Sequence, residues 1–128
     1  MNIHIKTIPS SRQRYSTCGD WWFKQNGDLE IRVSDMGDWR YEALVAFHEL
    51  AEVLMCKKLG IKTSTVDAFD KKFEKEREQG IHGEDEEPGD AEDAPYRKQH
   101  SMASALERTL SVMLDVSWNK YDKAIMES

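Results

Sequence analysis

DWRYEALVAFHELAEVLMCKKLG, residues 38–60, predicts one long helix around which the rest of the chain must be organised. Asp38 is a favourable N-cap, and Gly60 stands where a glycine commonly follows the last turn of a helix. These end signals place the helix at about Trp39 to Leu59. Apolar residues recur along it at helical spacing, so we expect one face to be buried.

Two polar residues share that face with the apolar side chains. At about 100° per residue, His48 and Glu52 fall in the same sector of the helix as Leu44 and Met55. A buried carboxylate without a partner is costly, so this sector must provide partners or line a cleft. The spacing i, i+4 also lets both side chains reach a single metal ion.

A third ligand has to come from another helix, and His100 is the best candidate. It lies one turn into the helix expected near the C-terminal end of the chain. With His48 and Glu52 it would complete a His2Glu set, a donor set that holds zinc in enzymes. Zn²⁺ is therefore the expected metal, whereas a site made only of carboxylate oxygens would favour Mg²⁺ or Mn²⁺.

Glu49 follows His48 directly, as a catalytic glutamate does in the H-E-x-x-H helix of zinc peptidases. In those enzymes this glutamate binds no metal but accepts a proton from the metal-bound water. Glu49 is therefore the candidate general base. The alternative is a solvated or ion-paired glutamate on the polar edge of the helix.

Four further residues are candidates for supporting roles around the site. Glu107 lies two turns beyond His100 on the same face, where it could orient a ligand histidine, bind the metal or simply be solvated. Asp67 is also explained as a helix cap, and Asp70 faces the same broad side as two phenylalanines. Tyr96 could donate a hydrogen bond to an oxyanion or serve packing alone.

Residues 1–37 predict a small antiparallel β-sheet. Alternating isoleucines favour a first strand at residues 3–8. Residues 21–25 and 29–33 flank the pair Asn26-Gly27, which supplies the positive φ angles of a type I′ hairpin turn. The expected arrangement is a hairpin accompanied by the first strand.

Residues 38–128 are expected to be helical apart from one loop. Ser64, with an acid three residues later, resembles the capping box of a second helix. Pro95 suits the first turn of a third helix, and Ser117 can cap a short last one. A small sheet followed by three or four helices is an α+β fold, and we expect residues 1–128 to form a single domain.

The acidic charge of the chain is concentrated in that loop, at residues 80–96. Seven of the 24 Asp and Glu residues lie there, without any Lys or Arg. The remaining 17 acids face 18 bases, so the rest of the chain is nearly neutral. No basic patch indicates binding to nucleic acid or to a membrane. The loop is expected to be solvated, or else to face a basic partner.

The two cysteines, Cys18 and Cys56, form no C-x-x-C pair. Neither a disulfide framework nor a cysteine-based zinc site is therefore indicated. No apolar segment is long enough to predict a signal peptide or a transmembrane helix. We expect a soluble protein of the cytoplasm.

Several short motifs resemble a group of phage and prophage proteins. They are AFHELAE (46–52), VDAFD (66–70), EPGD (87–90), APY (94–96) with His100, and VSWNKY (116–121). The resemblance covers most of the chain after residue 40, and it implies an origin and a host-cell cytoplasm more than an activity. It also implies one recurrent set of residues, namely His48, Glu52, Asp67, Asp70 and His100.

More distantly, the chain resembles zincin-type metallopeptidases. In that class a small sheet precedes the H-E helix, and a later helix brings a further ligand. Glu52 stands where those enzymes have their second histidine. The leading hypothesis is a zincin-like, metal-dependent hydrolase that attacks an amide or an ester.

Two other functions remain open at this point. The pairs Glu49-x-x-Glu52 and Asp67-x-x-Asp70 resemble the metal-binding acids of all-α nucleotide pyrophosphohydrolases, although His48 and the hairpin are foreign to that class. A phage accessory protein that binds a host protein without catalysis would need no motif. In that case the acidic loop would be a contact surface.

Overall fold

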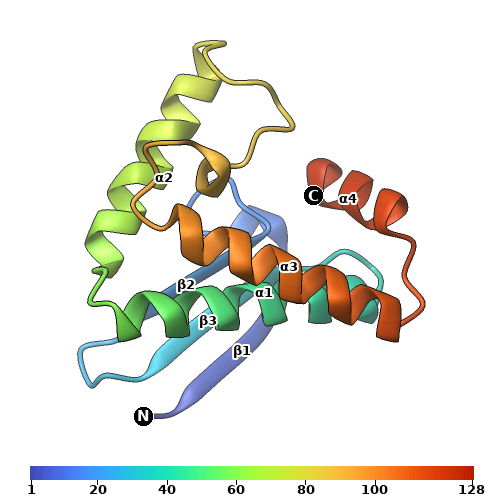
Figure 1. The fold of residues 1–128 in the computed structure, drawn as a ribbon, viewed down its shortest axis with the longest axis horizontal. Coiled ribbons are helices and arrows are strands. Elements are labelled where there is room, and N and C mark those ends of the chain that lie inside the picture. Colours follow the sequence, from blue (N-terminus) through green and yellow to red (C-terminus); the bar gives the residue numbers. More distant parts are fainter.

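The computed structural model describes all 128 residues and shows an α+β fold, a three-stranded sheet followed by four helices (Figure 1). The strands are β1 (Ile3–Ile8), β2 (Gly19–Phe23) and β3 (Leu29–Ser34). The helices are α1 (Trp39–Lys58), α2 (Thr63–Glu78), α3 (Arg97–Met113) and α4 (Trp118–Glu127), with short 3-10 turns η1 (Ser10–Arg12) and η2 (Pro88–Asp90) in the loops. The predicted fold class is confirmed. None of the helices combines the length and apolar character that a membrane crossing needs.

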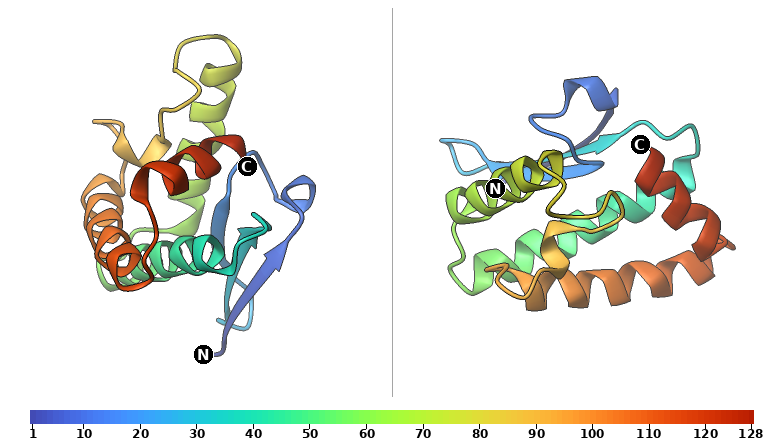
Figure 2. Two further views of the ribbon diagram at one scale, coloured as in Figure 1. Left: turned by 90° about the vertical axis from the view of Figure 1, so that its right-hand side faces the viewer. Right: turned by 90° about the horizontal axis from the view of Figure 1, so that it is seen from above.

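The helix α1 is the central element of the fold. It contacts β2 and β3 on one side and α3 on another, so it lies between the sheet and α3 (Figure 2). Its buried side chains are Leu44, Val45, His48, Glu52, Val53 and Cys56. The predicted inward orientation of His48 and Glu52 is therefore confirmed. The helices α2 and α4 stand on either side of the acidic loop (Figure 1).

The sheet is mixed, which corrects the expectation of an antiparallel sheet. β3 lies in the middle, with β1 parallel to it and β2 antiparallel to it. The long connection between β1 and β2 carries the chain past the central position to the far edge. β3 takes the centre because its Leu29, Ile31 and Val33 are fully buried on the face that α1 covers.

The hairpin turn also differs from the expected type I′ turn. The Gly27 N–H donates to the Lys24 carbonyl at 2.9 Å, and the Lys24 N–H donates to the Asp28 carbonyl at 2.9 Å. Gly27 has a positive φ of 90°, whereas Asn26 does not. The connection is therefore a three-residue loop, a type I turn followed by a left-handed glycine. The Asn26 side chain accepts from the Asp28 N–H at 3.0 Å, which favours this alternative.

The first and last helices begin where their sequence signals predict. The Asp38 carboxylate accepts from the Arg40 N–H at 2.9 Å, and the Ser117 hydroxyl accepts from the Lys120 N–H at 3.5 Å. Gly60 has a φ of 73°, the left-handed conformation expected just after a helix end. The placement of α1, which carries two site residues, is thus fixed by local sequence.

The helix α2 begins at Thr63 and has no side-chain cap, so Ser64 is not its N-cap. Asp67 instead accepts hydrogen bonds from both terminal nitrogens of Arg14, each at 3.1 Å. Such a two-point charged pair is stronger than a neutral cap hydrogen bond, which explains why the capping prediction is wrong. Pro95 lies in the turn that precedes α3, outside the first helical turn.

Candidate metal centre

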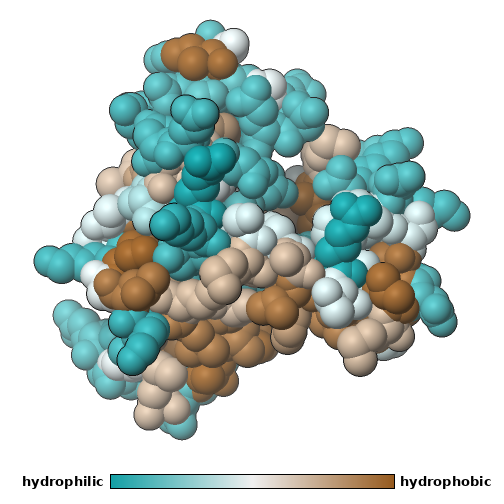
Figure 3. Space-filling model, viewed as in Figure 1, coloured by the Kyte–Doolittle hydropathy of each residue, from teal (hydrophilic) through white to brown (hydrophobic).

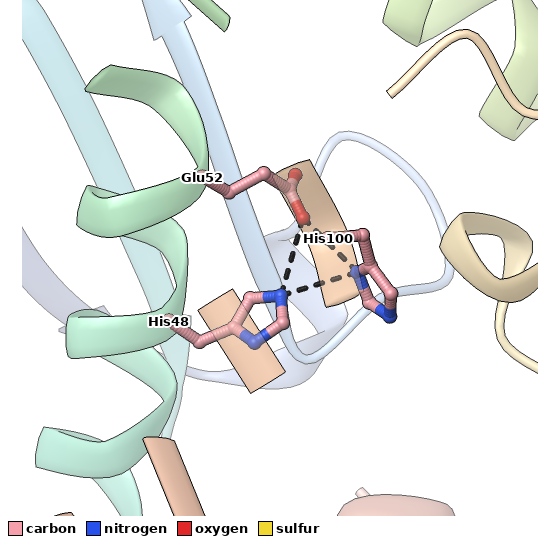
Figure 4. Close-up of side chains that lie close together, drawn as sticks. All are labelled: His48, Glu52 and His100. Carbon is pink, nitrogen blue, oxygen red and sulfur yellow. Dashed lines mark hydrogen bonds and ion pairs between the residues drawn. The ribbon is translucent and has the colours of Figure 1, made fainter. Parts of the chain in front are cut away.

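The side chains of His48, Glu52 and His100 converge on one point inside the molecule (Figure 4). His48 Nε2 lies 3.1 Å from Glu52 Oε2, His100 Nδ1 lies 3.0 Å from the same oxygen, and the two nitrogens are 3.2 Å apart. All three side chains are buried. The structure thus brings together the three residues that the sequence nominated as ligands, and the cluster can hold a metal ion.

The triangle of ligand atoms has nearly the size that a small divalent ion requires. Imidazole nitrogen and carboxylate oxygen bind zinc at about 2.0–2.2 Å, so tetrahedral ligands stand about 3.3–3.6 Å apart. The edges of the triangle, 3.0 to 3.2 Å, need only a slight expansion to reach that size. Three donors leave a further position of such an ion open to an incoming group.

Two packed helices position the cluster. His48 and Glu52 are one turn apart on α1, and His100 lies in the first turn of α3, which packs along α1. The two imidazole rings meet edge to face, with their centroids 4.8 Å apart. The cluster therefore forms only when the two helices are packed together.

Glu107 and Tyr121 hold His48 from behind. Glu107 Oε1 lies 2.7 Å from His48 Nδ1, the ring nitrogen that points away from the cluster. The Tyr121 hydroxyl donates to the other oxygen of Glu107. A carboxylate behind a ligand histidine fixes the orientation of the ring and raises its basicity. Orienting a ligand histidine was one of the roles that the sequence left open for Glu107, whereas Tyr121 was not among the candidate site residues.

Trp21 holds Glu52 in a comparable way. Its indole N–H donates to Glu52 Oε1 at 3.1 Å, while Oε2 faces the two histidines. Without this donor, a buried oxygen of Glu52 would lack a partner. A buried tryptophan resembles any core residue in a sequence, so this contact was not predicted.

The acidic loop supplies the outer partners of His100. His100 Nε2 lies 3.0 Å from Glu87 Oε2 and 3.4 Å from Asp90 Oδ1. Arg77 holds the loop in place, since its guanidinium donates to the backbone carbonyls of three loop residues, Gly83, Glu84 and Glu86. These contacts hold this part of the loop beside the candidate metal centre. The composition of the loop did not indicate that it would contact the site.

Gly89 makes the approach of the loop to His100 possible, because a methyl group there would come within 2.3–2.7 Å of the ring. We predict that Gly89→Ala displaces the loop and weakens zinc binding by about 10- to 100-fold. Gly83→Ala is the control, because its methyl group would come close only to the flexible end of Asp85, at 3.0 Å, and would make ordinary contacts with the Glu86 side chain. Competition with a chromophoric chelator measures both affinities. An unchanged affinity in Gly89→Ala would contradict the role assigned to this contact.

In the metal-free protein the surrounding acids keep both histidines charged. Burial opposes the charge on His48, but the hydrogen bonds to Glu107 and Glu52 outweigh it and raise the pKa of His48 to about 10. Burial likewise opposes the charge on His100, yet its three acidic neighbours raise its pKa to about 12. Burial would raise the pKa of Glu52, but the two histidines lower it to about 2. A metal ion must therefore displace protons from both rings.

Glu49 lies beside the cluster, on the wall of the adjoining cavity. Its carboxylate has no hydrogen-bond or ion-pair partner, and Oε1 packs so closely on Gly19 that a methyl group there would be 2.5 Å away. Burial, reinforced by the charge of Glu52 and opposed by that of His48, raises the pKa of Glu49 well above its usual range. The predicted base is thus an unpartnered carboxylate next to the candidate ligands.

The other predicted supporting residues lie on the cavity wall and make no hydrogen bond to the cluster. The Asp70 carboxylate accepts from the hydroxyls of Tyr15, at 3.0 Å, and Tyr96, while Asp67 is paired with Arg14. These contacts join the loop before β2 to α2 and to the turn before α3. The sequence did not reveal Tyr15 and Arg14, because they lie in an irregular segment without a periodic pattern.

Asp70 should make the stability of the protein depend on pH. Burial raises its pKa from 3.8 to about 7, although the two tyrosine hydroxyls act in the opposite direction. Because the folded pKa is the higher one, this stabilising contribution is complete below pH ~4 and is lost as the pH rises toward 7. Relative to Asp70→Asn, the wild type should lose up to about 4 kcal/mol of unfolding free energy between pH 4 and pH 8. Urea unfolding of the chelator-treated proteins measures this difference, and a constant difference would contradict the assignment.

The candidate metal centre opens into a cavity of about 490 Å³. The wall is formed by β2 and the loop before it, together with α1, α2, the acidic loop, α3 and α4. This volume falls within the range of about 300–1,000 Å³ that is common for small-molecule sites. A ligand in the cavity would reach both the cluster and Glu49.

No protein-family model matches this chain, and no curated protein or solved structure is significantly similar to it. The chemistry of the site therefore has to follow from its own residues.

Proposed function

We propose that this protein is a metal-dependent hydrolase with a zincin-like site, in which His48, Glu52 and His100 hold zinc. The observation that carries the proposal is the pattern of partners around these side chains. Each one points a donor atom at a common centre, and each has its other polar atom bound by a separate side chain. Ligand residues of metal sites are oriented in this way. A His–Glu pair that served only the fold would need neither this convergence nor a cavity beside it.

The donor set favours zinc with a position left open for catalysis. Relative to H-E-x-x-H enzymes with a later glutamate ligand, the order along the chain changes from His, His, Glu to His, Glu, His, but the set of donors is the same. The ion would polarise the carbonyl group of an amide or an ester. Glu49 would accept a proton from the attacking water and pass it to the leaving group.

The alternative of nucleotide pyrophosphate hydrolysis at an all-carboxylate site gains no support. Arg14 binds Asp67, and two tyrosines bind Asp70, so neither carboxylate is free to hold Mg²⁺ or Mn²⁺. Two imidazole rings also occupy the centre of the candidate site, where hard cations prefer oxygen. A non-catalytic phage accessory protein that binds a host protein is the remaining alternative, and it requires no turnover.

Metal analysis of protein purified without chelator tests the proposal. We expect close to one zinc ion per chain, lost in His48→Ala and His100→Ala and kept in the control His82→Ala, whose ring stacks on Phe73 away from the cluster. Zinc-loaded protein should hydrolyse a pool of fluorogenic peptides and esters, and chelator treatment should abolish this turnover. Absence of any transition metal would overturn the metal site. Bound iron would instead indicate a reaction with molecular oxygen, because two histidines and one carboxylate also hold iron in oxygenases. Bound zinc without turnover would support the role of a non-catalytic accessory protein.

A further inference from the structure

We infer that the cavity takes a peptide segment carrying a Lys or Arg side chain, an inference that rests on the proposed hydrolase and names its substrate class. The basis is an extreme segregation of charge. Thirteen of the 24 acidic residues line this cavity, but only one of the 18 Lys and Arg residues does, namely Arg77. A cavity lined by one sign of charge concentrates ligands of the opposite sign.

Much of this negative charge is not neutralised within the protein. Arg77 pairs with Glu74, and Arg14, outside the lining, pairs with Asp20 and Asp67. A divalent ion in the centre would offset only two further charges. Five lining acids have no ion-pair partner, namely Glu49, Asp70, Glu84, Asp85 and Asp122, and of these Asp70 accepts hydrogen bonds from two tyrosine hydroxyls.

The unpaired acids lie at two levels of the cavity. Glu84 and Asp85 are exposed on the acidic loop. Glu49 is deeper, next to His48, and its carboxylate has no partner in the protein. Glu49 is half-buried and lines the cavity, so its carboxylate is open to a ligand atom there. Acidic side chains thus line the cavity from the acidic loop to the candidate metal centre.

The wall across the cavity from the acidic loop suits the apolar stem of a Lys or Arg side chain. Trp118, Ile125 and Met126 line the cavity from α4, together with Asp122, and α4 stands across from the acidic loop (Figure 1). Figure 3 shows hydrophilic residues over α2 and the acidic loop, with the hollow between them and α4. Lys and Arg combine an apolar stem with a cationic end, so they match both walls at once. An acidic side chain would be repelled, and a neutral apolar one would leave the unpaired acids without a partner.

Binding to the zinc-loaded protein tests this inference without requiring turnover. The probes are short, blocked, fluorescent peptides that differ at one position, which holds Lys, Arg, norleucine or Glu. Norleucine has an apolar stem without the charge. We expect the Lys and Arg peptides to bind about ten-fold more tightly than the norleucine peptide, and this preference to shrink as salt is raised.

Two double variants locate the charge that is responsible. Glu84→Gln with Asp85→Asn should reduce the preference for Lys over norleucine by about three-fold or more. The matched control is Glu92→Gln with Asp93→Asn, which removes the same charge from the same loop but from exposed residues outside the cavity lining. The control should keep the preference of the wild type.

Equal affinities for the Lys and norleucine peptides, no binding of any peptide, or equal losses in both double variants would overturn the inference. Tighter binding of free spermidine than of the Lys peptide would also overturn it, because the cavity would then suit a polyamine. A preference for Lys without hydrolysis would support this inference and remove the proposed hydrolase. Hydrolysis without a preference for Lys would support the proposed hydrolase and overturn this inference about its substrate.

Discussion

Addition of zinc to the chelator-treated protein is expected to raise the free energy of unfolding by about 4 kcal/mol when free zinc is about 1,000 times its dissociation constant. The unfolded chain offers no such site, because His100 meets His48 and Glu52 only when α3 packs on α1. For a chain of 128 residues, a gain of this size raises the melting temperature by on the order of 10–20 °C. Thermal unfolding followed by circular dichroism at fixed free zinc measures it.

The gain from zinc should increase with pH. In the metal-free protein the pKa of His48 is about 10, above the value of about 6.5 in an unfolded chain. The stabilisation that comes from the charged ring is therefore complete below pH ~6.5 and is lost as the pH rises toward 10. Zinc requires the neutral ring, so protons compete with it at low pH. The difference in melting temperature between zinc-loaded and metal-free protein should be small at pH 5.5 and large at pH 8.5.

Histidine variants show whether the cluster causes this gain. His100→Ala should unfold at the same temperature with and without zinc, whereas His82→Ala should respond as the wild type does. Cooperative unfolding of His100→Ala would establish that the variant is folded. If wild-type protein gains no stability from zinc at pH 8.5, His48, Glu52 and His100 form a buried hydrogen-bond network and not a metal site.

Much of the arrangement could be predicted from the sequence because its causes are local. Asp38 and Gly60 determine where α1 begins and ends, and helical spacing alone places His48 and Glu52 on one buried face. The choice of His100 rested on the same periodicity in a second helix. Local rules were sufficient for these three residues because each faces the contact between two regular helices.

The parts that could not be predicted depend on contacts between distant segments. The parallel pairing of β1 with β3 depends on the long connection from β1 to β2, which leaves the central position of the sheet to β3. No residue type in the sequence indicates the course of this connection. Trp21 and Tyr121 bind site carboxylates, but their positions in the sequence are those of ordinary core residues. Asp67 satisfied a local capping rule, yet the distant Arg14 binds it instead. Charge pairing across the fold outweighed a weaker local preference in that case.

Glu49→Gln is expected to lower kcat for the proposed hydrolysis by about 10²- to 10⁴-fold, the usual contribution of a general base. Glutamine has nearly the same size, so the close contact with Gly19 is kept while the ability to accept a proton is lost. Since Glu49 is not among the converging ligand atoms, zinc content and the zinc-dependent rise in melting temperature should stay unchanged. Glu78→Gln, at an exposed position of α2 outside the cavity lining, is the control and should keep full activity.

Metal content and turnover, measured together in Glu49→Gln, separate the roles open to this carboxylate. Loss of turnover with zinc retained identifies a base, because only the proton-accepting oxygen has been replaced. Loss of both would make Glu49 a ligand and would favour a centre richer in carboxylates, nearer to one for Mn²⁺ or Mg²⁺. Full turnover with zinc retained would refute the role of Glu49 as the base. Its unpartnered carboxylate would then be explained by the cationic ligand inferred for the cavity, because that ligand needs only a hydrogen-bond acceptor at this place and no transfer of a proton.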